Sequence, residues 1–265
     1  MAEASTILRC RVGSQAYGLS TEASDLDEKG VCVEPFETYC TLSGKFENYE
    51  YRSAAERTGK SDAPSEVGDL DLTIYSLEKF LRLATYGNPN IVELLFISGD
   101  SILEATQAGA DLRDLYPAII SRQCGRRYLG YMEAQKQRLL GERGQMRVTR
   151  TDLIEAHGFD TKFASHMLRL GFQGVELLET GKLVLPLEGE VRDTLLAVKT
   201  GKWSLNEALQ LAGDLETKVK DLIKDGPIRD QPDLATVEKF MRATYLATWE
   251  TTRGLYAQLL NQSIH

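Results

Sequence analysis

Strand and helix patterns alternate over the first 110 residues. Thr6–Val12 is rich in β-formers and stops at Gly13-Ser14, and Gly30–Val33 carries β-branched residues before Pro35, so both stretches predict strands. Asp69–Tyr75 alternates strictly and predicts a third strand. Its apolar face carries Leu70, Leu72 and Ile74, and its polar face carries Asp69, Asp71 and Thr73. Two carboxylates therefore share one face of this strand.

A helical pattern follows the third strand. Leu77, Phe80, Leu81 and Ala84 recur at helical spacing, and Asn90 is expected to cap the next helix. We interpret Asn88, Pro89, Asn90 and Glu93 as structural residues at this boundary. Residues 41–68, which precede the third strand, are rich in Ser, Gly, Lys and Glu and predict a long mobile loop or a loose hairpin.

From about residue 111 the patterns are mainly helical. They cover 112–140, 151–180, 190–200, 204–224 and 233–260, and the only extended piece expected lies around Lys182–Leu187. No internal repeat or proline-rich linker interrupts the sequence. We predict an α+β fold with a catalytic domain of residues 1–110, a packed boundary near 100–115, and a mostly helical nucleotide- or substrate-binding domain of residues 111–265.

The composition is that of a folded, water-soluble protein. Hydrophobic residues make up 42% and charged residues 26% of the sequence, which excludes disordered and collagen-like classes. The net charge is −8 and the isoelectric point is near 5.1, which argues against a surface that grips nucleic acid everywhere. Residues 1–110 carry 9 basic and 18 acidic side chains, whereas residues 111–265 carry 22 and 21. The acidic first part could hold cations.

The sequence gives no sign of export or of a membrane span. Its N-terminus has no basic start followed by an apolar run, and no stretch of about 18 apolar residues occurs. The four cysteines form no CxxC pair and predict reduced thiols. We therefore expect a cytoplasmic protein without a membrane partner, and we predict no oligomeric state.

A set of short motifs predicts phosphoryl-group chemistry. The Gly13-Ser14 turn leaves the end of a strand, where backbone N–H groups and a hydroxyl can hold phosphate oxygens. Asp25 and Asp27 are two residues apart on an extended segment, so they point the same way and offer the oxygen ligands that Mg²⁺ prefers. Asp71 adds a third carboxylate, with Asp69 as the reserve candidate.

These carboxylates could hold two Mg²⁺ ions, or Mn²⁺ in their place, about 3.5–4 Å apart during an in-line displacement at the α-phosphate of a nucleoside triphosphate such as ATP. Asp25 and Asp27 would bridge the metals and anchor the triphosphate. Asp71 would hold the metal that activates the incoming hydroxyl and would accept the proton of that hydroxyl.

The stretch GSQAYGLSTEASDLDEKGV resembles the signature of the nucleotidyltransferases of the DNA polymerase β superfamily, in the branch of RNA-repair-pathway polymerase-β-like proteins. The stretches DLDLTIYSLEKF, GNPNIVELLF and HGFDTKFASHMLRL are similar to that branch in the same order, so the resemblance spans residues 9–200. It implies a mixed sheet with flanking helices, Mg²⁺-dependent nucleotide transfer, a helical partner domain, and Asp71 rather than Asp69 as the third carboxylate. It makes Gly13, Ser14 and Tyr17 candidate nucleotide-binding residues.

Two positions depart from the family pattern. Glu28 stands where an apolar residue is usual, so it either exposes the strand or adds a fourth carboxylate. Phe163 stands where related sequences tend to have a histidine.

A second candidate surface for the triphosphate lies on the predicted helix around residue 165. Lys162, His166 and Arg169 fall at i, i+4 and i+7 and line one helix face, with Lys162 as the first candidate for phosphate contact. The alternative, which applies also to the preceding Asp160, is a solvated polar face opposite Phe163, Met167 and Leu170, with His166 only hydrogen-bonded.

Residues 122–150 form a basic stretch of 8 basic and 2 acidic side chains. Candidate contacts to an RNA backbone are Arg122, Arg126, Arg127 and Arg138, and the interleaved Tyr128 and Tyr131 could stack on bases. The alternative is a helix that only faces water. Trp203, Tyr245, Leu246 and Trp249 are interpreted as packing residues.

The sequence therefore favours a Mg²⁺-dependent enzyme that adds a nucleotide from a nucleoside triphosphate to an RNA end, such as tRNA in repair, and releases pyrophosphate. Two alternatives stay open. One is nucleotidyl transfer to a protein hydroxyl or a small molecule, and the other is a nucleotide- or RNA-binding module without turnover.

Overall fold

A five-stranded mixed sheet organises the first part of the chain. The structure is a computed structural model that describes residues 2, 5–20, 26–42, 44–61, 63, 66, 68–142 and 150–262, without the side chains of 252 and 254–262. The strands are β1 (Thr6–Arg11), β2 (Leu26–Cys32), β3 (Asn48–Arg52), β4 (Leu70–Ser76) and β5 (Ile102–Ala105), in the order β3-β4-β2-β1-β5. β2 and β4 run parallel, and the other neighbours run antiparallel. The predicted mixed sheet with flanking helices is confirmed.

The three predicted strands are confirmed as β1, β2 and β4. β2 begins earlier than predicted, at Leu26, so Asp27 lies within it. The loop interpretation of residues 41–68 is wrong, because this stretch contains β3, which pairs antiparallel with β4, and the helix α3 (Ser53–Thr58). β5 was also missed. β3 and β5 lie at the edges of the sheet, where neither has a fully buried side chain, so no alternation of buried and exposed positions marks them.

The long helices of the second part follow the predicted stretches closely, whereas the short helices before residue 60 were not predicted. Those of the first part are α1 (Gly13–Ala16), α2 (Phe36–Tyr39), α3, α4 (Leu77–Thr85), α5 (Pro89–Val92), α6 (Gln107–Asp114) and α7 (Tyr116–Ile119), with 3-10 turns η2 (Glu93–Leu95) and η3 (Gly99–Ser101). Those of the second part are α8 (Arg122–Leu139), α9 (Thr151–His157), α10 (Thr161–Thr180), α11 (Gly189–Lys199), α12 (Leu205–Asp225) and α13 (Leu234–Gln262). Lys182–Leu187, which was expected to be extended, forms no strand.

The cap of α5 corrects one prediction. Asn88, rather than Asn90, caps this helix, and its side chain accepts a hydrogen bond from the Asn90 backbone N–H at 3.1 Å. Pro89 then occupies the first helical position, where its missing N–H costs nothing.

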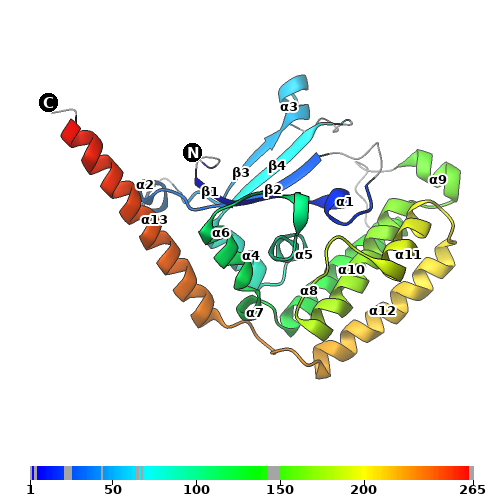
Figure 1. The fold of residues 1–265 in the computed structure, drawn as a ribbon. Coiled ribbons are helices and arrows are strands. Elements are labelled where there is room, and N and C mark those ends of the chain that lie inside the picture. The colour runs from blue at the N-terminus through cyan, green and yellow to red at the C-terminus, as the bar shows by residue number, and fades with distance from the viewer. Residues whose placement is uncertain are drawn as a thin grey trace.

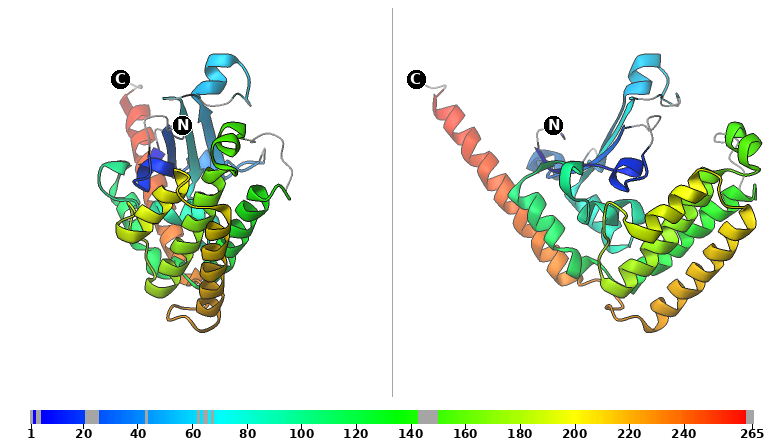
Figure 2. Two further views of the ribbon diagram at one scale, coloured as in Figure 1. Left: turned by 90° about the vertical axis from the view of Figure 1, so that its right-hand side faces the viewer. Right: turned by 45° about the vertical axis from the view of Figure 1, so that its right-hand side comes forward.

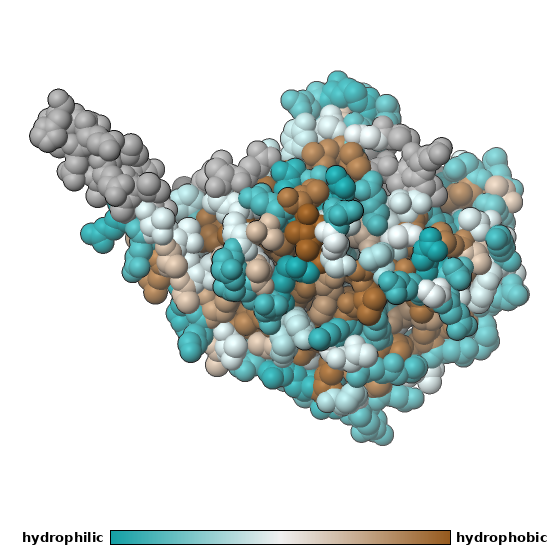
Figure 3. All heavy atoms as spheres, viewed as in Figure 1, coloured by the Kyte–Doolittle hydropathy of each residue, from teal (hydrophilic) through white to brown (hydrophobic). Residues whose placement is uncertain are grey.

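Helices α4–α7 lie against one face of the sheet, and α8, α10, α11 and α12 form a bundle beside it (Figures 1 and 2). One cluster of buried apolar side chains runs from β1 and β2 through α4 and α5 into α8 and α10. A smaller cluster around Leu72 and Ile74 lies on the opposite face of the sheet. In Figure 3 the surface over α3 is hydrophilic, whereas apolar side chains gather over the middle of the face in view.

Helix α13 leaves the bundle and packs beside α4 and α7 (Figure 1). Trp249 donates its indole N–H to the Glu34 carbonyl oxygen at 3.0 Å, and the Tyr245 hydroxyl donates to Glu34 Oε1 at 3.0 Å. Tyr39 packs against both rings. The packing role predicted for Tyr245 and Trp249 is confirmed, whereas that predicted for Leu246 is wrong, because Leu246 is exposed. Among the described residues, no helix is both long and apolar enough to cross a membrane.

Candidate active site

Two of the predicted catalytic carboxylates are direct neighbours in the sheet. Asp27 on β2 and Asp71 on β4 are register partners in the parallel pair, so their side chains leave the same face side by side. Both are half-buried. Asp25 lies outside the described residues. Within the part that the structure describes, no cluster of three or more His, Cys, Asp or Glu side chains could hold a metal ion, but two adjacent carboxylates are the donor type that suits a hard divalent cation.

The turn after β1 lies directly against Asp27. The Val12 N–H donates to the Asp27 carbonyl oxygen at 2.9 Å, and α1 begins at the next residue. Gly13 has a φ of +68°, and a Cβ there would lie 2.6 Å from Asp27 Oδ2. Only glycine therefore fits both this backbone conformation and this contact. The structure brings Gly13 and Asp27 together as the motif predicts, with Ser14 one residue further on.

Asp69 has a different environment from Asp71, although the two residues are two apart and their side chains were predicted to share one face. Ser53 Oγ donates to Asp69 at 2.8 Å, the Glu66 N–H donates at 2.8 Å, and Arg57 forms an ion pair at 2.9 Å. These hydrogen bonds lower the pKa of Asp69 to about 2. Asp69 thus ties α3 and the segment after it to the start of β4.

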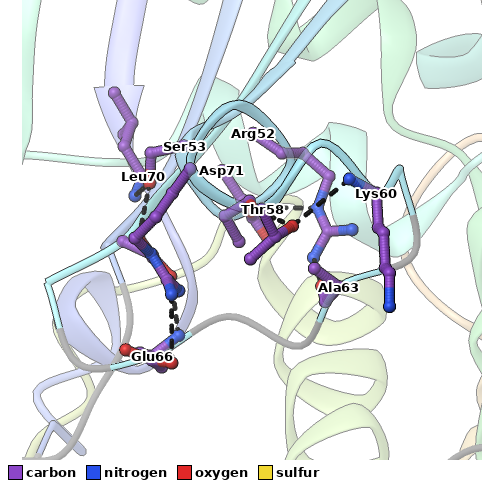
Figure 4. A network of polar contacts seen from close by, with 11 residues as sticks. Arg52, Ser53, Thr58, Lys60, Ala63, Glu66, Leu70 and Asp71 are labelled. Atoms are coloured by element: carbon purple, nitrogen blue, oxygen red, sulfur yellow. Dashed lines mark hydrogen bonds and ion pairs between the residues drawn. The ribbon is translucent and has the colours of Figure 1, made fainter.

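Arg52 links Asp71 to the segment after α3, in the network shown in Figure 4. It is the register partner of Asp71 across the antiparallel pair, and its Nε lies 3.2 Å from Asp71 Oδ1. The same guanidinium donates to the carbonyl oxygens of Ser61 and Ala63 at 2.9 and 3.0 Å. A cation is therefore already placed beside this carboxylate.

Glu28 does not join the carboxylate pair. Side chains alternate along a strand, so Glu28 leaves the face opposite to Asp27. There its Oε2 lies 2.6 Å from Arg9 Nε. The interpretation of Glu28 as a fourth carboxylate of the site is wrong, because this ion pair turns it away from Asp27.

Behind the aspartates lies a buried polar cluster centred on Glu93. The Tyr17 hydroxyl donates to Glu93 Oε2, and Lys29 Nζ lies 3.2 Å from Glu93 Oε1. Arg169 lies with Nη1 4.0 Å from Glu93 Oε2 and with its guanidinium 4.0 Å from the Tyr17 ring centroid. Burial raises the pKa of Tyr17 well above its ordinary range, so the phenol keeps its proton. Tyr17 and Arg169 are both buried, and these contacts occupy them within the protein.

The cluster joins three elements of the site. Lys29 lies two residues after Asp27 on β2, Tyr17 closes the turn that begins at Gly13, and Arg169 belongs to α10. Lys29 also donates to the Asn90 carbonyl oxygen at 2.9 Å. Glu93 therefore fixes the carboxylate strand, the glycine–serine turn and the helix relative to one another.

His166 on α10 faces a group of cations. Burial, followed by the charges of Arg169, Arg138, Lys162 and Lys29, lowers the pKa of His166 well below its ordinary range, so the imidazole is neutral near pH 7. Its Nε2 is buried without a hydrogen-bond partner among the described residues. Lys162 is exposed. Asp160 caps α10 by accepting from the N–H groups of Lys162 and Phe163, which confirms a structural role for it.

Helix α11 and the segment before it hold the glycine–serine turn from the other side. The Leu187 N–H donates to the Tyr17 carbonyl oxygen at 3.2 Å, and Arg192 donates to that of Gly18 at 3.2 Å. Lys199 donates to the Leu19 carbonyl oxygen at 2.6 Å. The pKa of Lys199 is lowered by burial and by the nearby Lys162. The helical bundle thus positions the turn and adds cations next to it.

The four predicted RNA-binding arginines separate into two sets. Arg122 and Arg126 lie 3.7 and 3.9 Å from Asp230. Arg127 and Arg138 are exposed, and no carboxylate among the described residues pairs with either. Tyr128 is only 1% exposed, so the prediction that it stacks on bases is wrong. Cys124, Tyr128 and Met132 recur every four residues and face the core, a spacing that could have revealed this.

Four residues of the site were not anticipated: Lys29, Arg52, Glu93 and Lys199. Glu93 lies in an apolar helical stretch, Ile91–Leu95, and a charge there is a sign of a buried ion pair. The other three carry no local signal, because their partners lie far away in the sequence.

The stretch that contains Gly13, Ser14 and Asp27 resembles the nucleotidyltransferases of the DNA polymerase β superfamily, and the structure places Gly13 and Asp71 beside Asp27. The sequence model of one such family, the RNA repair pathway DNA polymerase beta family, matches residues 1–243. The chain belongs to that family.

Two individual proteins are also similar to the chain. An uncharacterized 38.9 kDa protein of Enterobacteria phage T4, from the nrdC-mobD intergenic region, is 26% identical over 136 residues, which are 49% of this chain and 37% of the phage protein. The chain thus spans well under half of that relative. A crystal structure of a nucleotidyltransferase-like protein from Exiguobacterium sibiricum 255-15 aligns with 83% of this chain and 69% of its own, at 10% identity and a TM-score of 0.29.

Proposed function

We propose that the protein transfers a nucleotide from a nucleoside triphosphate to the hydroxyl of an RNA end, such as that of a tRNA, and releases pyrophosphate. The observation that carries this proposal is the in-register pair of Asp27 and Asp71 beside the turn at Gly13. Membership of an RNA repair family supports RNA as the acceptor.

In this reaction the acceptor oxygen forms a bond to the α-phosphorus, and the bond from that phosphorus to the bridging oxygen of the β-phosphate breaks. Pyrophosphate leaves with the electron pair, and Asp71 takes the proton of the hydroxyl. Asp27 and Asp71, together with Asp25, would hold Mg²⁺, which supplies positive charge at the α-phosphate when it is bound. Arg52 orients the Asp71 carboxylate through their ion pair.

The other candidate residues have three kinds of role in this proposal. Ser14, Lys162 and His166 contact the triphosphate, and neutral His166 donates or accepts a hydrogen bond without adding charge. Tyr17 and Arg169 act through Glu93, because their polar groups are committed to that buried cluster. Lys29 and Lys199 add positive charge behind the phosphates.

The test is incubation of the protein with Mg²⁺, each radiolabelled nucleoside triphosphate in turn and total small RNA, followed by a denaturing gel and a pyrophosphate assay. Label on RNA with the natural protein and none with Asp27→Asn supports the proposal. Label on protein or on a small molecule instead moves the acceptor to that class. Nucleotide binding without pyrophosphate release indicates a binding module.

A further inference from the structure

A strip of aromatic and cationic side chains leads away from Asp71 along β4 and α8. We call it the tyrosine–arginine strip, and it consists of Tyr75, Tyr86, Arg127, Tyr131 and Arg138. Tyr75 leaves the same face of β4 as Asp71, because the two are four residues apart on a strand. Tyr86 is the C-cap of α4, and the other three residues belong to α8.

Contacts between α4 and α8 hold the strip together. The Arg127 guanidinium lies over the Tyr86 ring, 5.5 Å from its centroid. Gly87, next to Tyr86, packs so tightly on α8 that a Cβ would lie 2.5 Å from Cys124 Cα. At the other end, Tyr75 and Tyr131 both pack against the main apolar cluster, and burial, followed by the charges of Glu50 and Tyr131, raises the pKa of Tyr75. Residues 127, 131 and 138 are spaced by four and seven, so they share one side of α8.

The strip carries positive charge and is partly open to solvent, with Tyr75 and Tyr131 half-buried against the main apolar cluster. Tyr86 is 51% exposed, and Arg127 and Arg138 are exposed. Both arginines lack a carboxylate partner among the described residues, whereas Arg126, one residue from Arg127, lies 3.9 Å from Asp230. Glu47, which lies near β4 and α4, is ion-paired with Lys79 and Arg82 at 3.0 and 2.9 Å.

We propose that the tyrosine–arginine strip binds the single-stranded end of the acceptor RNA, with bases stacked on Tyr86 and Tyr131 and phosphates on Arg127 and Arg138. Aromatic rings beside unpaired arginines suit single-stranded nucleic acid, because every base has a stacking face and every linkage has a charge. Four residues of strand span about 13 Å, so Tyr75 lies within a few nucleotides of Asp71. The orientation of the RNA, with its end towards Asp71, rests on the proposed function, because it brings the terminal hydroxyl to Asp71.

Binding of a fluorescein-labelled single-stranded RNA of about 12 nucleotides, a length within the known range of site sizes, tests the strip without nucleotide or turnover. We expect Tyr86→Ala and Arg127→Ala each to weaken the affinity roughly tenfold, because stacking and phosphate contacts are lost. Tyr86→Phe keeps the ring and should restore binding to within about twofold of the natural protein. Thermal unfolding midpoints establish that each variant is folded.

Two variants serve as matched controls. Tyr49 is 37% exposed on β3, and its register partner is Ile74, so it faces away from Asp71. Arg242 lies on α13 and pairs with Glu238. Tyr49→Ala and Arg242→Ala should bind RNA as the natural protein does. Equal affinity of Tyr86→Ala and the natural protein for the single-stranded RNA would contradict the proposed binding surface. Equally tight binding of a duplex would contradict it too, because the bases of a duplex cannot stack on protein.

Pyrophosphate release measured on the same preparations separates the strip from the proposed function. RNA binding that depends on the strip, without pyrophosphate release in the presence of Mg²⁺, supports the strip as an RNA-binding surface and contradicts the transfer reaction. If the natural protein and Tyr86→Ala transfer nucleotide to RNA equally well at RNA concentrations below saturation, the transfer reaction is supported. The same result contradicts the proposal that the strip binds the acceptor RNA.

Discussion

Asp71 and Asp69 are two residues apart in the sequence, yet their neighbours in the structure differ, and so do the roles that we propose for them. Asp71 adjoins Asp27, whereas Asp69 is held by Ser53, Arg57 and the Glu66 N–H. We expect Asp71→Asn to lower turnover roughly 10²–10³-fold, since it removes charge from the reacting centre without changing volume. Asp69→Asn is the matched control and should retain turnover. Steady-state pyrophosphate assays compare the two, and the reverse order of effects would move the third carboxylate to Asp69.

Asp69 should instead show its role in the pH dependence of stability. Its pKa falls from 3.8 to about 2 on folding, so it contributes stability that is complete above pH 3.8 and is lost as the pH falls towards 2. The urea midpoints of the natural protein and Asp69→Asn should therefore differ near neutral pH and converge on acidification. A constant difference across that range would contradict the assignment.

Glu93 shows what the sequence could not reveal at this scale. Asp25, Asp27 and Asp71 stand out because their spacing is local, but Glu93 meets Lys29 from 64 residues away. Glu93→Gln would leave the buried Arg169 and the half-buried Lys29 without a counter-charge, so we expect a loss of about 3–5 kcal/mol in the free energy of unfolding. Tyr17→Phe, which removes only one donor to the carboxylate, should cost about 1.5–3 kcal/mol. Urea unfolding followed by circular dichroism measures both.

Helices were predicted better than strands because their signal is longer. The stretches that became α10, α12 and α13 each repeat an apolar face over many turns. β3 and β5 have only 5 and 4 residues, and pairing with an inner strand, rather than their own pattern, makes them strands. The position of α13 could not be predicted either, because no local sequence pattern indicates that it packs on α4 rather than on the bundle.

The docking of α13 depends on a few aromatic contacts. Trp249 packs against Tyr39, Phe36 and Tyr245 and binds the Glu34 carbonyl. Trp249→Ala should therefore cost about 3 kcal/mol, the lower end for a large aromatic side chain, because Trp249 is only half-buried. Trp249→Phe keeps much of the packing and should cost less. Thermal unfolding of both variants tests this, and a negligible effect of Trp249→Ala would show that α13 is held elsewhere.

At the scale of the whole molecule, charge is unevenly distributed. The net charge of −8 would repel RNA, but residues 1–110 hold an excess of acidic groups, and the proposed catalytic aspartates are among them. The cations of β2, α8, α10 and α11 gather on the other side of the same site, around His166 and the turn at Gly13. A phosphate chain can thus approach along the bundle while the carboxylates retain their metal-binding charge.

This distribution makes RNA affinity depend on salt through a small number of contacts. The logarithm of the affinity should fall linearly with the logarithm of the salt concentration, with a slope that loses about 0.7 for each phosphate contact removed from a single strand. Arg127→Ala combined with Arg138→Ala should therefore reduce the slope by about 1.4. Arg242 lies on α13 and pairs with Glu238, so Arg242→Ala should leave the slope unchanged. Anisotropy titrations at several KCl concentrations give these slopes, and equal slopes for the double variant and the natural protein would mean that α8 does not contact the RNA backbone.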